Sequence, residues 1–207
     1  MKPAIDVFYP IVPDFAWMQR IVPLGIRTVQ LRLKDASPPE VALQIDESLA
    51  ICARHQCQLI VNDHWQEAMT AGADYVHLGQ EDLATADISK LKSLGIRIGL
   101  SSHSREELAT ALAVNPDYIA LGPIWETKLK AMKWAPQGLG RLGEWKRRMG
   151  AIPLVAIAGI TVERAPSVLD AGADSAAVIT DFMTHADPVA RLKEWLAWAD
   201  KARSSLN

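Results

Sequence analysis

A repeated pattern along the chain constrains its fold more than any single motif. Short apolar segments, most of them opened by a small or loop residue, recur eight times, and each leads into polar residues. They are "IDVFYPIV" (5–12), "LGIRTVQLRLKD" (24–35), "HQCQLIVND" (55–63), "AGADYVHLGQED" (71–82), "LGIRIGLSSH" (94–103), "NPDYIALGP" (115–123), "IPLVAIAGI" (152–160) and "AGADSAAVIT" (171–180). Segments of this length and composition are typical of buried parallel strands. Eight of them predict a closed parallel sheet.

The stretches between these segments carry helical spacing of apolar residues. The spacing is clearest in residues 39–55, 104–114 and 188–202. Strands that alternate with helices predict right-handed crossovers, so we expect an α/β fold, a single-domain (β/α)8 TIM barrel that spans residues 1–207 with few insertions. A doubly wound open sheet is the alternative. It usually needs fewer strands, and no GxGxxG motif follows the first one.

The amino-acid composition limits the kinds of molecule that the chain is expected to bind. Among the 207 residues, 49% are apolar and 22% are charged, and the formal net charge is −2. This balance gives no whole-surface attraction to nucleic acid or to an anionic membrane, so we expect small-molecule partners at a local site. No apolar run approaches the roughly 20 residues of a membrane span. The N-terminus resembles a first strand more than a secretory signal, and Cys52 and Cys57 fit neither a disulfide framework nor a CxxC motif. These features favour a cytoplasmic protein, and the oligomeric state does not follow from them.

The second segment places polar side chains at the end of a strand. In a TIM barrel, the active site lies where the strands run into the following loops. Because strand side chains alternate, Gln30, Arg32 and Lys34 share one face, which we expect to point into the barrel mouth. A solvated edge strand would explain the same alternation, but a barrel strand beneath helices has no solvated face.

Two carboxylates follow the next two strands. Asn62 and Asp63 end one strand, and His77, Gln80 and Asp82 follow the other. Asn62, Asp63 or Asp82 would also serve as a helix N-cap. Yet carboxylates beside cations at one rim suggest a hard divalent ion such as Mg²⁺, shared with a diphosphate.

A second anion position is predicted farther along the chain. Ser101 ends the fifth strand and offers a hydroxyl, whereas Ser102 or Ser104 would serve as a cap of the next helix. Gly159 allows close backbone approach, and the turns after strands seven and eight form the phosphate site of many TIM barrels. The lysine-rich segment "ETKLKAMKW" (126–134) lies between the two anion positions in the sequence.

The chain resembles the thiamine-phosphate synthase family (thiamine phosphate pyrophosphorylases) along nearly its whole length. Each matching motif is weak alone, but their order and spacing are specific. They are "QLRLK" (30–34), "NDHWQEA" (62–68), "VHLGQED" (76–82), "GLSSH" (99–103), "YIALGPIW" (118–125), "APQGL" (135–139) and "AIAGIT" (156–161).

The resemblance implies a transferase of thiamine biosynthesis. Such an enzyme joins hydroxymethylpyrimidine diphosphate to hydroxyethylthiazole phosphate, with loss of pyrophosphate. The family's roles carry over to the matching positions here. They imply Mg²⁺ ligands at Asp63 and Asp82; diphosphate contacts at Arg32, Lys34, Asn62 and Lys130; pyrimidine contacts at Gln30, Asn62, Tyr9 and His77; Ser101 near the leaving group; and thiazole phosphate contacts at Thr127, Gly159, Ile179 and Thr180. Arg32, Lys34, Ser101 and Lys130 would be the catalytic residues.

Departures from the family pattern leave two alternatives. Glu126 and Leu129 replace a proline and a threonine that are usual in the family, and Ala158 replaces a glycine. A thiazole tautomerase-like sibling shares the Glu-Thr pair at 126–127, but it lacks the aspartate that is Asp82 here. A non-catalytic phosphate-ligand binding protein is the other alternative, and the joint retention of the anion-site and metal-site residues argues against it.

Overall fold

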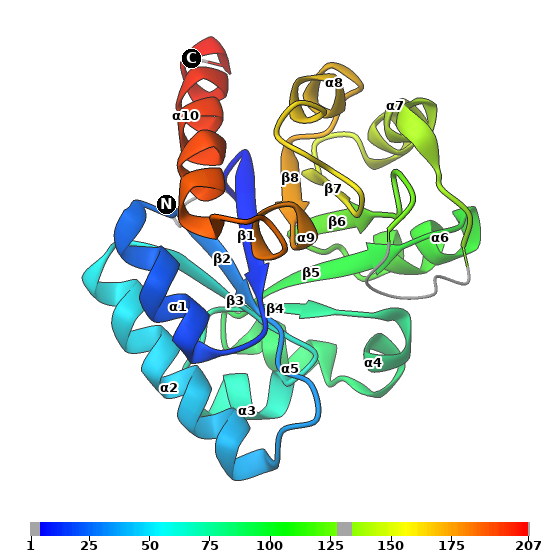
Figure 1. Cartoon of the computed structure of the whole chain (residues 1–207). Coiled ribbons are helices and arrows are strands. Elements are labelled where there is room, and N and C mark those ends of the chain that lie inside the picture. Colours follow the sequence, from blue (N-terminus) through cyan, green and yellow to red (C-terminus); the bar gives the residue numbers. More distant parts are fainter. Residues whose placement is uncertain (1–4, 128–133, 207) are drawn as a thin grey trace.

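A computed structural model describes residues 5–127 and 134–206. Eight parallel strands form a closed barrel in sequence order, in which β8 pairs with β1 (Figure 1). The strands are β1 (Phe8–Val12), β2 (Thr28–Leu31), β3 (Gln58–Asn62), β4 (Tyr75–Leu78), β5 (Arg97–Ser102), β6 (Tyr118–Leu121), β7 (Leu154–Ile157) and β8 (Ser175–Val178). The predicted TIM barrel is therefore confirmed, and the open-sheet alternative is wrong.

Helices surround the barrel and connect its strands (Figure 1). They are α1 (Phe15–Ile21), α2 (Pro38–Arg54), α3 (Trp65–Thr70), α4 (Gln80–Thr85), α5 (Ile88–Ser93), α6 (Arg105–Ala113), α7 (Gly138–Met149), α8 (Ala165–Asp170), α9 (Thr180–Met183) and α10 (Pro188–Leu206), with a short 3-10 helix at Val22–Leu24. Local sequence explains where several begin. Ser37 and Glu40 form a capping box at the start of α2, and Ser104 caps α6 by accepting the Glu107 backbone N–H. Such caps satisfy backbone donors that a helix start leaves free.

Alternation along the strands separates two apolar layers. In β2, Val29 and Leu31 pack in the large core between sheet and helices, and Leu33 continues this series just after the strand. In β1 and β3, Tyr9 and Ile60 face the inner cluster that fills the barrel. Each strand is therefore buried on both faces. The face under the helices requires apolar side chains, whereas the face inside the barrel permits selected polar ones.

A large aromatic side chain occupies the barrel interior. Tyr118, at the start of β6, is fully buried and pairs in register with Gly99 of β5. A Cβ atom on Gly99 would lie 2.1 Å from the Tyr118 ring. Glycine in a strand interior marks such close approaches. Gly99 thus allows Tyr118 to reach across the barrel.

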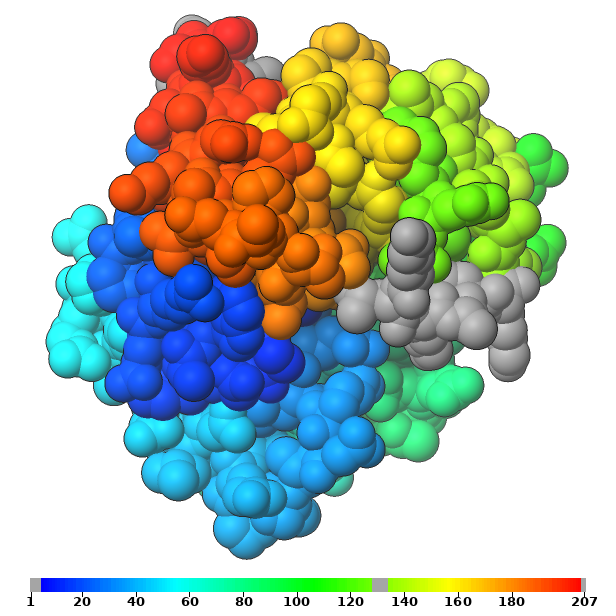
Figure 2. Space-filling view, in the orientation of Figure 1, coloured from blue at the N-terminus to red at the C-terminus, as the bar shows by residue number. Residues whose placement is uncertain are grey.

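The two ends of the described chain meet on one side of the barrel. Arg203 of α10 forms an ion pair of 2.7 Å with Asp6, and Phe8 stacks on Trp195 with ring centroids 4.8 Å apart. Nearby, Trp17 of α1 meets Phe182 of α9 edge to face at 5.8 Å, and Figure 2 shows the blue and orange segments side by side on this face. In the part of the chain that the structure describes, no helix has the length and hydropathy needed to cross a membrane.

Candidate functional site

The predicted site residues gather at the carboxyl ends of the strands, as this fold requires. Most lie in the last residues of a strand or in the loop that follows, while Tyr9 lies within β1. Their places are Gln30 in β2, Arg32 and Lys34 after it, Asn62 and Asp63 at the end of β3, His77 in β4, Asp82 in α4, Ser101 in β5, Thr127 after β6, Gly159 after β7, Ile179 between β8 and α9, and Thr180 as the first residue of α9. Lys130 lies outside the described residues.

The polar side chains at the end of the second strand become more exposed along the chain. β2 ends at Leu31, earlier than the sequence pattern suggested, although the Arg32 backbone N–H still donates to the Val12 carbonyl at 2.8 Å. Gln30 is buried, Arg32 is half-buried and Lys34 is exposed. β2 is paired on both sides, by β1 and β3, so it is not an edge strand. The predicted alternation therefore leads from the barrel interior to its rim.

Two carboxylates and a cation meet at the rim. Lys34 Nζ donates to Asp63 Oδ2 at 3.1 Å. Burial raises the pKa of the Asp82 carboxyl, and the negative charge of Asp63 raises it further. A direct charge effect of this kind requires the two carboxyl groups to lie close together. The predicted meeting of Lys34 and Asp63 is confirmed, and the effects of Asp63 and Lys34 on the pKa of Asp82 agree with its predicted place beside them.

Helix capping explains these carboxylates only in part. The N-cap of α3 is His64, without a side-chain cap bond, and Asp63 has a left-handed backbone with φ of 64°. Asp63 is therefore no cap. Asp82 lies in the first turn of α4, and a hydrogen bond with the Gly79 backbone lowers its pKa against the effects of burial and of Asp63. Asp82 thus contacts the helix start and faces Asp63 as well.

The donor set at this rim suits a hard cation. Within residues 5–127 and 134–206, no group of three or more His, Cys, Asp or Glu side chains is arranged to hold a metal ion. Mg²⁺, however, commonly takes only one or two protein carboxylates and completes its shell with water and substrate phosphate oxygens. Asp63 and Asp82 supply two such carboxylates, and a cation between them would relieve their mutual repulsion. The residues present fit Mg²⁺.

A buried polar network lies in the barrel beneath this rim. Tyr9 OH donates to Tyr118 OH at 3.4 Å, and Tyr118 OH lies 2.7 Å from His77 Nδ1. His77 Nε2 lies 2.8 Å from Ser101 Oγ. Burial raises the pKa of Tyr118 well above its ordinary value, while a side-chain hydrogen bond with Gln30 acts in the opposite direction. Four of these side chains were predicted site residues, and Tyr118 links them.

Burial determines the charge of His77. It lowers the pKa of this imidazole to about 4, while the Asp63 charge raises that pKa and the Arg32 and His103 charges lower it. His77 is therefore neutral near pH 7, with one ring nitrogen as donor and the other as acceptor. The Asp63 backbone N–H donates to the His77 carbonyl at 2.9 Å, so these two residues are direct neighbours.

The two neighbours of Ser101 in sequence have structural roles. The Ser102 hydroxyl donates to the Ala120 carbonyl at 3.1 Å and accepts the indole N–H of buried Trp145 at 2.9 Å. Ser104 is the N-cap of α6, as one alternative predicted. Ser101 is held differently, because Gln80 Nε2 donates to its carbonyl at 2.6 Å and its hydroxyl meets His77.

The predicted monophosphate side lies after β7 and β8. Gly159 has φ of 71°, and a Cβ atom there would lie 2.6 Å from Trp125 Cβ, so the backbone approaches the loop after β6 closely. Arg164 lies over the Trp125 ring at 4.9 Å and donates to the Gly159 carbonyl at 2.7 Å. Thr180 begins α9. Sequence reasoning missed Arg164, which brings a cation to this turn.

A salt-bridge cluster supports the same side. Arg191 of α10 contacts Asp181 through Nε at 2.8 Å and Nη2 at 3.0 Å, and it also contacts Glu163 and Glu194. The Trp195 indole N–H donates to Asp181 at 2.7 Å. Because Asp181 is adjacent to Thr180, these contacts fix the start of α9 against α10.

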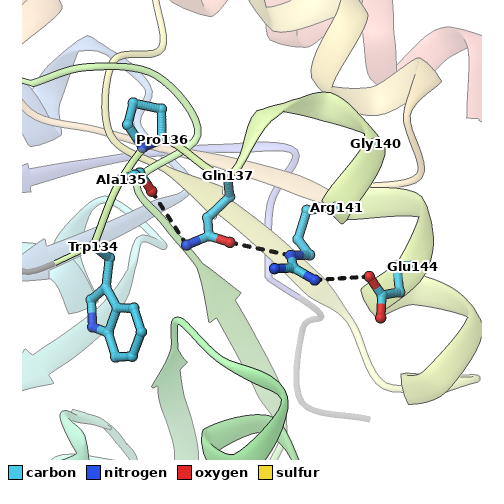
Figure 3. Close-up of a pocket in the computed structure, with 7 residues that line it drawn as sticks. All are labelled: Trp134, Ala135, Pro136, Gln137, Gly140, Arg141 and Glu144. Atoms are coloured by element: carbon cyan, nitrogen blue, oxygen red, sulfur yellow. Dashed lines mark hydrogen bonds and ion pairs between the residues drawn. The ribbon is translucent and has the colours of Figure 1, made fainter.

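A surface pocket of about 460 Å³ lies at the start of α7, beside the end of the loop after β6 (Figure 3). Arg141 bridges Gln137 and Glu144 there, and the Trp134 ring stacks with His103 at 5.9 Å. The described residues lining this pocket include none of the predicted site residues. The pocket therefore shares no lining residue with the predicted site.

Tyr118 is the residue of the network that the sequence pattern did not single out. It begins a strand, where an aromatic residue is ordinary core material. The usable signal was Gly99, a glycine inside the neighbouring apolar strand, which indicated a close approach by something large.

Comparison with known proteins gives concordant results. A family model described as "Thiamine monophosphate synthase" matches residues 9–182. A protein of Rhizobium etli named "Thiamine-phosphate synthase" is 55% identical over 193 residues, which cover 93% of this chain and 95% of that protein. A protein of the same name from Neisseria meningitidis serogroup A is 45% identical, with 93% of this chain and 94% of that protein covered.

The fold comparison agrees. The solved structure titled "Thiamine phosphate pyrophosphorylase from Pyrococcus furiosus" matches with a TM-score of 0.81 and 26% identity, over 94% of this chain and 95% of that one.

Proposed function

We propose that this chain, which belongs to the thiamine monophosphate synthase family and joins hydroxymethylpyrimidine diphosphate to hydroxyethylthiazole phosphate, carries out this reaction at the rim around Asp63 and Asp82. The observation that carries this placement is the meeting of Asp63, Asp82 and Lys34 above a buried polar network. Such a rim can hold both a divalent cation and a diphosphate.

Asp63 and Asp82 would hold Mg²⁺. When bound, the ion supplies positive charge that stabilises the departing pyrophosphate. Lys34 sits against Asp63 with about half of its side chain exposed, so it can reach the diphosphate without leaving the rim. Half-buried Arg32 offers a planar fork for phosphate oxygens. The family resemblance adds Asn62 to these contacts.

The buried polar groups would receive the pyrimidine. Gln30, Asn62 and His77 are nearly buried, with small exposed fractions at the bottom of the rim. Tyr9 is deeper and bonds to Tyr118, so it would act chiefly by supporting this floor. Loss of pyrophosphate leaves a cation that the electron-rich aminopyrimidine can carry until the thiazole nitrogen attacks it. The site must therefore stabilise the leaving anion and exclude water, and it needs no protein nucleophile.

The thiazole phosphate would bind across the turns after β7 and β8. Gly159, Ile179 and Thr180 can present backbone N–H groups there, and Thr180 and Thr127 add hydroxyls. Lys130 would complete the diphosphate contacts from the loop after β6.

Residues 1–207 are proposed to form one domain. The closure of β1 on β8 and the ion pair between Asp6 and Arg203 support this organisation. The cytoplasmic location stays a prediction from the sequence. Cys52 and Cys57, on which it rests in part, are free and buried.

One experiment tests both the activity and its placement. Pyrophosphate release from the pyrimidine diphosphate would be measured with and without Mg²⁺ and with and without the thiazole phosphate. We expect release only when the metal and both substrates are present. A thiazole tautomerase-like sibling would release no pyrophosphate under any condition. A non-catalytic binding protein would bind the phosphates, as calorimetry would show, without turnover.

A further inference from the structure

We propose that Tyr118 is a positioning residue which, acting through His77, holds the Ser101 hydroxyl as a hydrogen-bond donor toward the leaving pyrophosphate. This inference rests on the proposed placement of the diphosphate at the rim. It assigns to a fully buried residue of the barrel interior an indirect effect on whether the Ser101 hydroxyl donates or accepts at the site.

The hydrogen-bond count begins at Tyr118. A phenol oxygen carries one hydrogen and accepts two hydrogen bonds. The buried Tyr9 hydroxyl needs an acceptor for its hydrogen, and the acceptor that the structure describes for it is the Tyr118 oxygen, at 3.4 Å. The Gln30 side chain is a further hydrogen-bond partner of Tyr118. Because Tyr9 donates to the Tyr118 oxygen, Tyr118 has its own hydrogen left for its short contact with His77 Nδ1, at 2.7 Å.

The hydrogen bond from Tyr118 determines the tautomer of His77. A neutral imidazole that accepts at Nδ1 carries its hydrogen on Nε2. That hydrogen then points to Ser101 Oγ, at 2.8 Å. The Ser101 hydroxyl therefore accepts from His77 and keeps its own hydrogen for another partner. The hydrogen bonds run in one direction, from Tyr9 through Tyr118 and His77 to Ser101.

The direction matters because the leaving group is an anion. A hydroxyl that donates to an oxygen of the departing pyrophosphate stabilises the charge that develops there. With the opposite His77 tautomer, Ser101 would donate to Nε2 and present only lone pairs to the anion, which would repel it. Tyr118 thus determines whether Ser101 stabilises or repels the leaving anion.

The direct test is the tautomer of His77. Protein labelled with ¹⁵N at histidine would be studied by NMR, and His77 would be assigned with a His77→Gln variant. In the parent, we expect the hydrogen on Nε2. In Tyr118→Phe, the ring remains beside Gly99 but the donor is gone, so the Nδ1 and Nε2 signals should shift toward a mixture of tautomers. A parent His77 that carries its hydrogen on Nδ1 would overturn the proposal.

Kinetics supply the second readout. Loss of a direct anion donor costs about 10²- to 10³-fold in turnover, so an indirect loss of orientation should lower kcat of Tyr118→Phe by roughly tenfold. The KM for the pyrimidine diphosphate should change little, because the diphosphate contacts remain. Tyr75→Phe is the matched control, since Tyr75 packs edge to face on Tyr118 at 5.7 Å and lies outside the hydrogen-bonded series. It should leave both the His77 tautomer and kcat unchanged.

A double-mutant cycle separates this role from simple support of the fold. If Tyr118 acts through Ser101, Tyr118→Phe should have no further effect on kcat in a Ser101→Ala background. Equal effects in both backgrounds, or an unchanged kcat in Ser101→Ala alone, would contradict the proposal. A parent that makes no thiamine phosphate would instead refute the proposed function, whereas the tautomer measurement needs no turnover.

Discussion

The ammonium group of Lys34 lies 3.1 Å from a carboxylate oxygen of Asp63, at the rim where β2 and β3 end. The Lys34 side chain is 52% exposed and that of Asp63 is 25% exposed. Ion pairs this accessible contribute about 0–1 kcal/mol to stability. Asp63 also holds a left-handed backbone that a non-glycine residue rarely adopts. The arrangement is therefore better explained by what the rim binds than by what it adds to the fold.

Changing either rim carboxylate should remove activity and preserve the fold. Asp63→Asn and Asp82→Asn keep the side-chain shape, and asparagine tolerates the left-handed backbone of Asp63. Because a bound metal supplies several kcal/mol of charge stabilisation, we expect turnover to fall by about a hundredfold or more. Melting temperatures should hold or rise slightly, since two like charges no longer oppose each other.

Glu81→Gln is the control for these variants. It removes an exposed carboxylate next to Asp82 and should leave turnover at the parent level. Parent-like turnover of both asparagine variants at saturating Mg²⁺ would show that the metal lies elsewhere.

Arg32→Lys tests the planar clamp on the diphosphate. The substitution keeps the positive charge and loses the bidentate fork, so we expect kcat/KM for the pyrimidine diphosphate to fall by about tenfold or more. The melting temperature should hardly change. Arg27→Lys, at an exposed position just before β2, should affect neither quantity. A variant that melts many degrees lower with normal kinetics would make Arg32 a structural residue.

Gly99→Ala tests the packing that admits Tyr118 to the barrel. The added methyl would lie 2.1 Å from the Tyr118 ring, in an interior that cannot move far. Overpacking of this kind costs about 1–3 kcal/mol, or roughly 2–12 °C in melting temperature for a chain of this size. Turnover should fall too, because the displaced ring carries the Tyr118 hydroxyl away from His77.

Two further variants serve as controls for Gly99→Ala. Gly140→Ala in α7 meets nothing within 4 Å and should be neutral or mildly stabilising. Gly99→Ala combined with Tyr118→Leu should recover much of the melting temperature and little of the turnover. Full recovery of turnover would mean that the phenol is dispensable.

The barrel could be predicted from the sequence because the apolar patterns that specify its strands and helices repeat along the chain. Eight apolar segments that alternate with helical spacing permit few topologies, and the alternation of inward and outward side chains over residues 29–34 followed from their sequence alone. Asp63 and Asp82 were predictable as neighbours for the same reason, since adjacent parallel strands end at the same edge.

The rest of the site depends on contacts between strands that periodicity does not encode. Tyr118 meets His77 from two strands away, and a buried tyrosine looks like any other core residue in the sequence. Arg164 likewise reaches from the segment after β7 to Trp125 in the loop after β6, and no spacing rule relates these two positions. Capping of α6 by Ser104 was local and therefore foreseeable.

Glu163→Gln should weaken the cluster around Arg191 in a pH-dependent way. The hydrogen bond from Arg191 is the main cause that lowers the pKa of Glu163, from 4.5 to about 2. A carboxyl whose pKa is lower in the folded state stabilises the fold above its unfolded pKa, and it loses that contribution as the pH falls toward the folded pKa. Parent and variant should therefore differ most above pH 4.5 and converge near pH 2. Because the Glu163 side chain is 66% exposed, the difference should stay below about 1 kcal/mol. Melting curves at several pH values would check this, and a constant gap across the range would contradict it.

Ala158→Gly should stabilise the protein. Ala158 has φ of 74°, a left-handed conformation that costs a residue with a Cβ atom about 1–2 kcal/mol and costs glycine nothing. Glycine loses about 0.4–1 kcal/mol of this gain through the greater freedom of the unfolded chain, so the net gain should approach about 1 kcal/mol. For a chain of this length, that corresponds to roughly 2–4 °C in melting temperature. Ala156→Gly is the control, since Ala156 lies in β7 and is fully buried, and it should lower the melting temperature instead. If Ala158→Gly also lowers it, the Ala158 methyl group makes packing contacts that outweigh the backbone strain, and the departure from the family's usual glycine is a stabilising one.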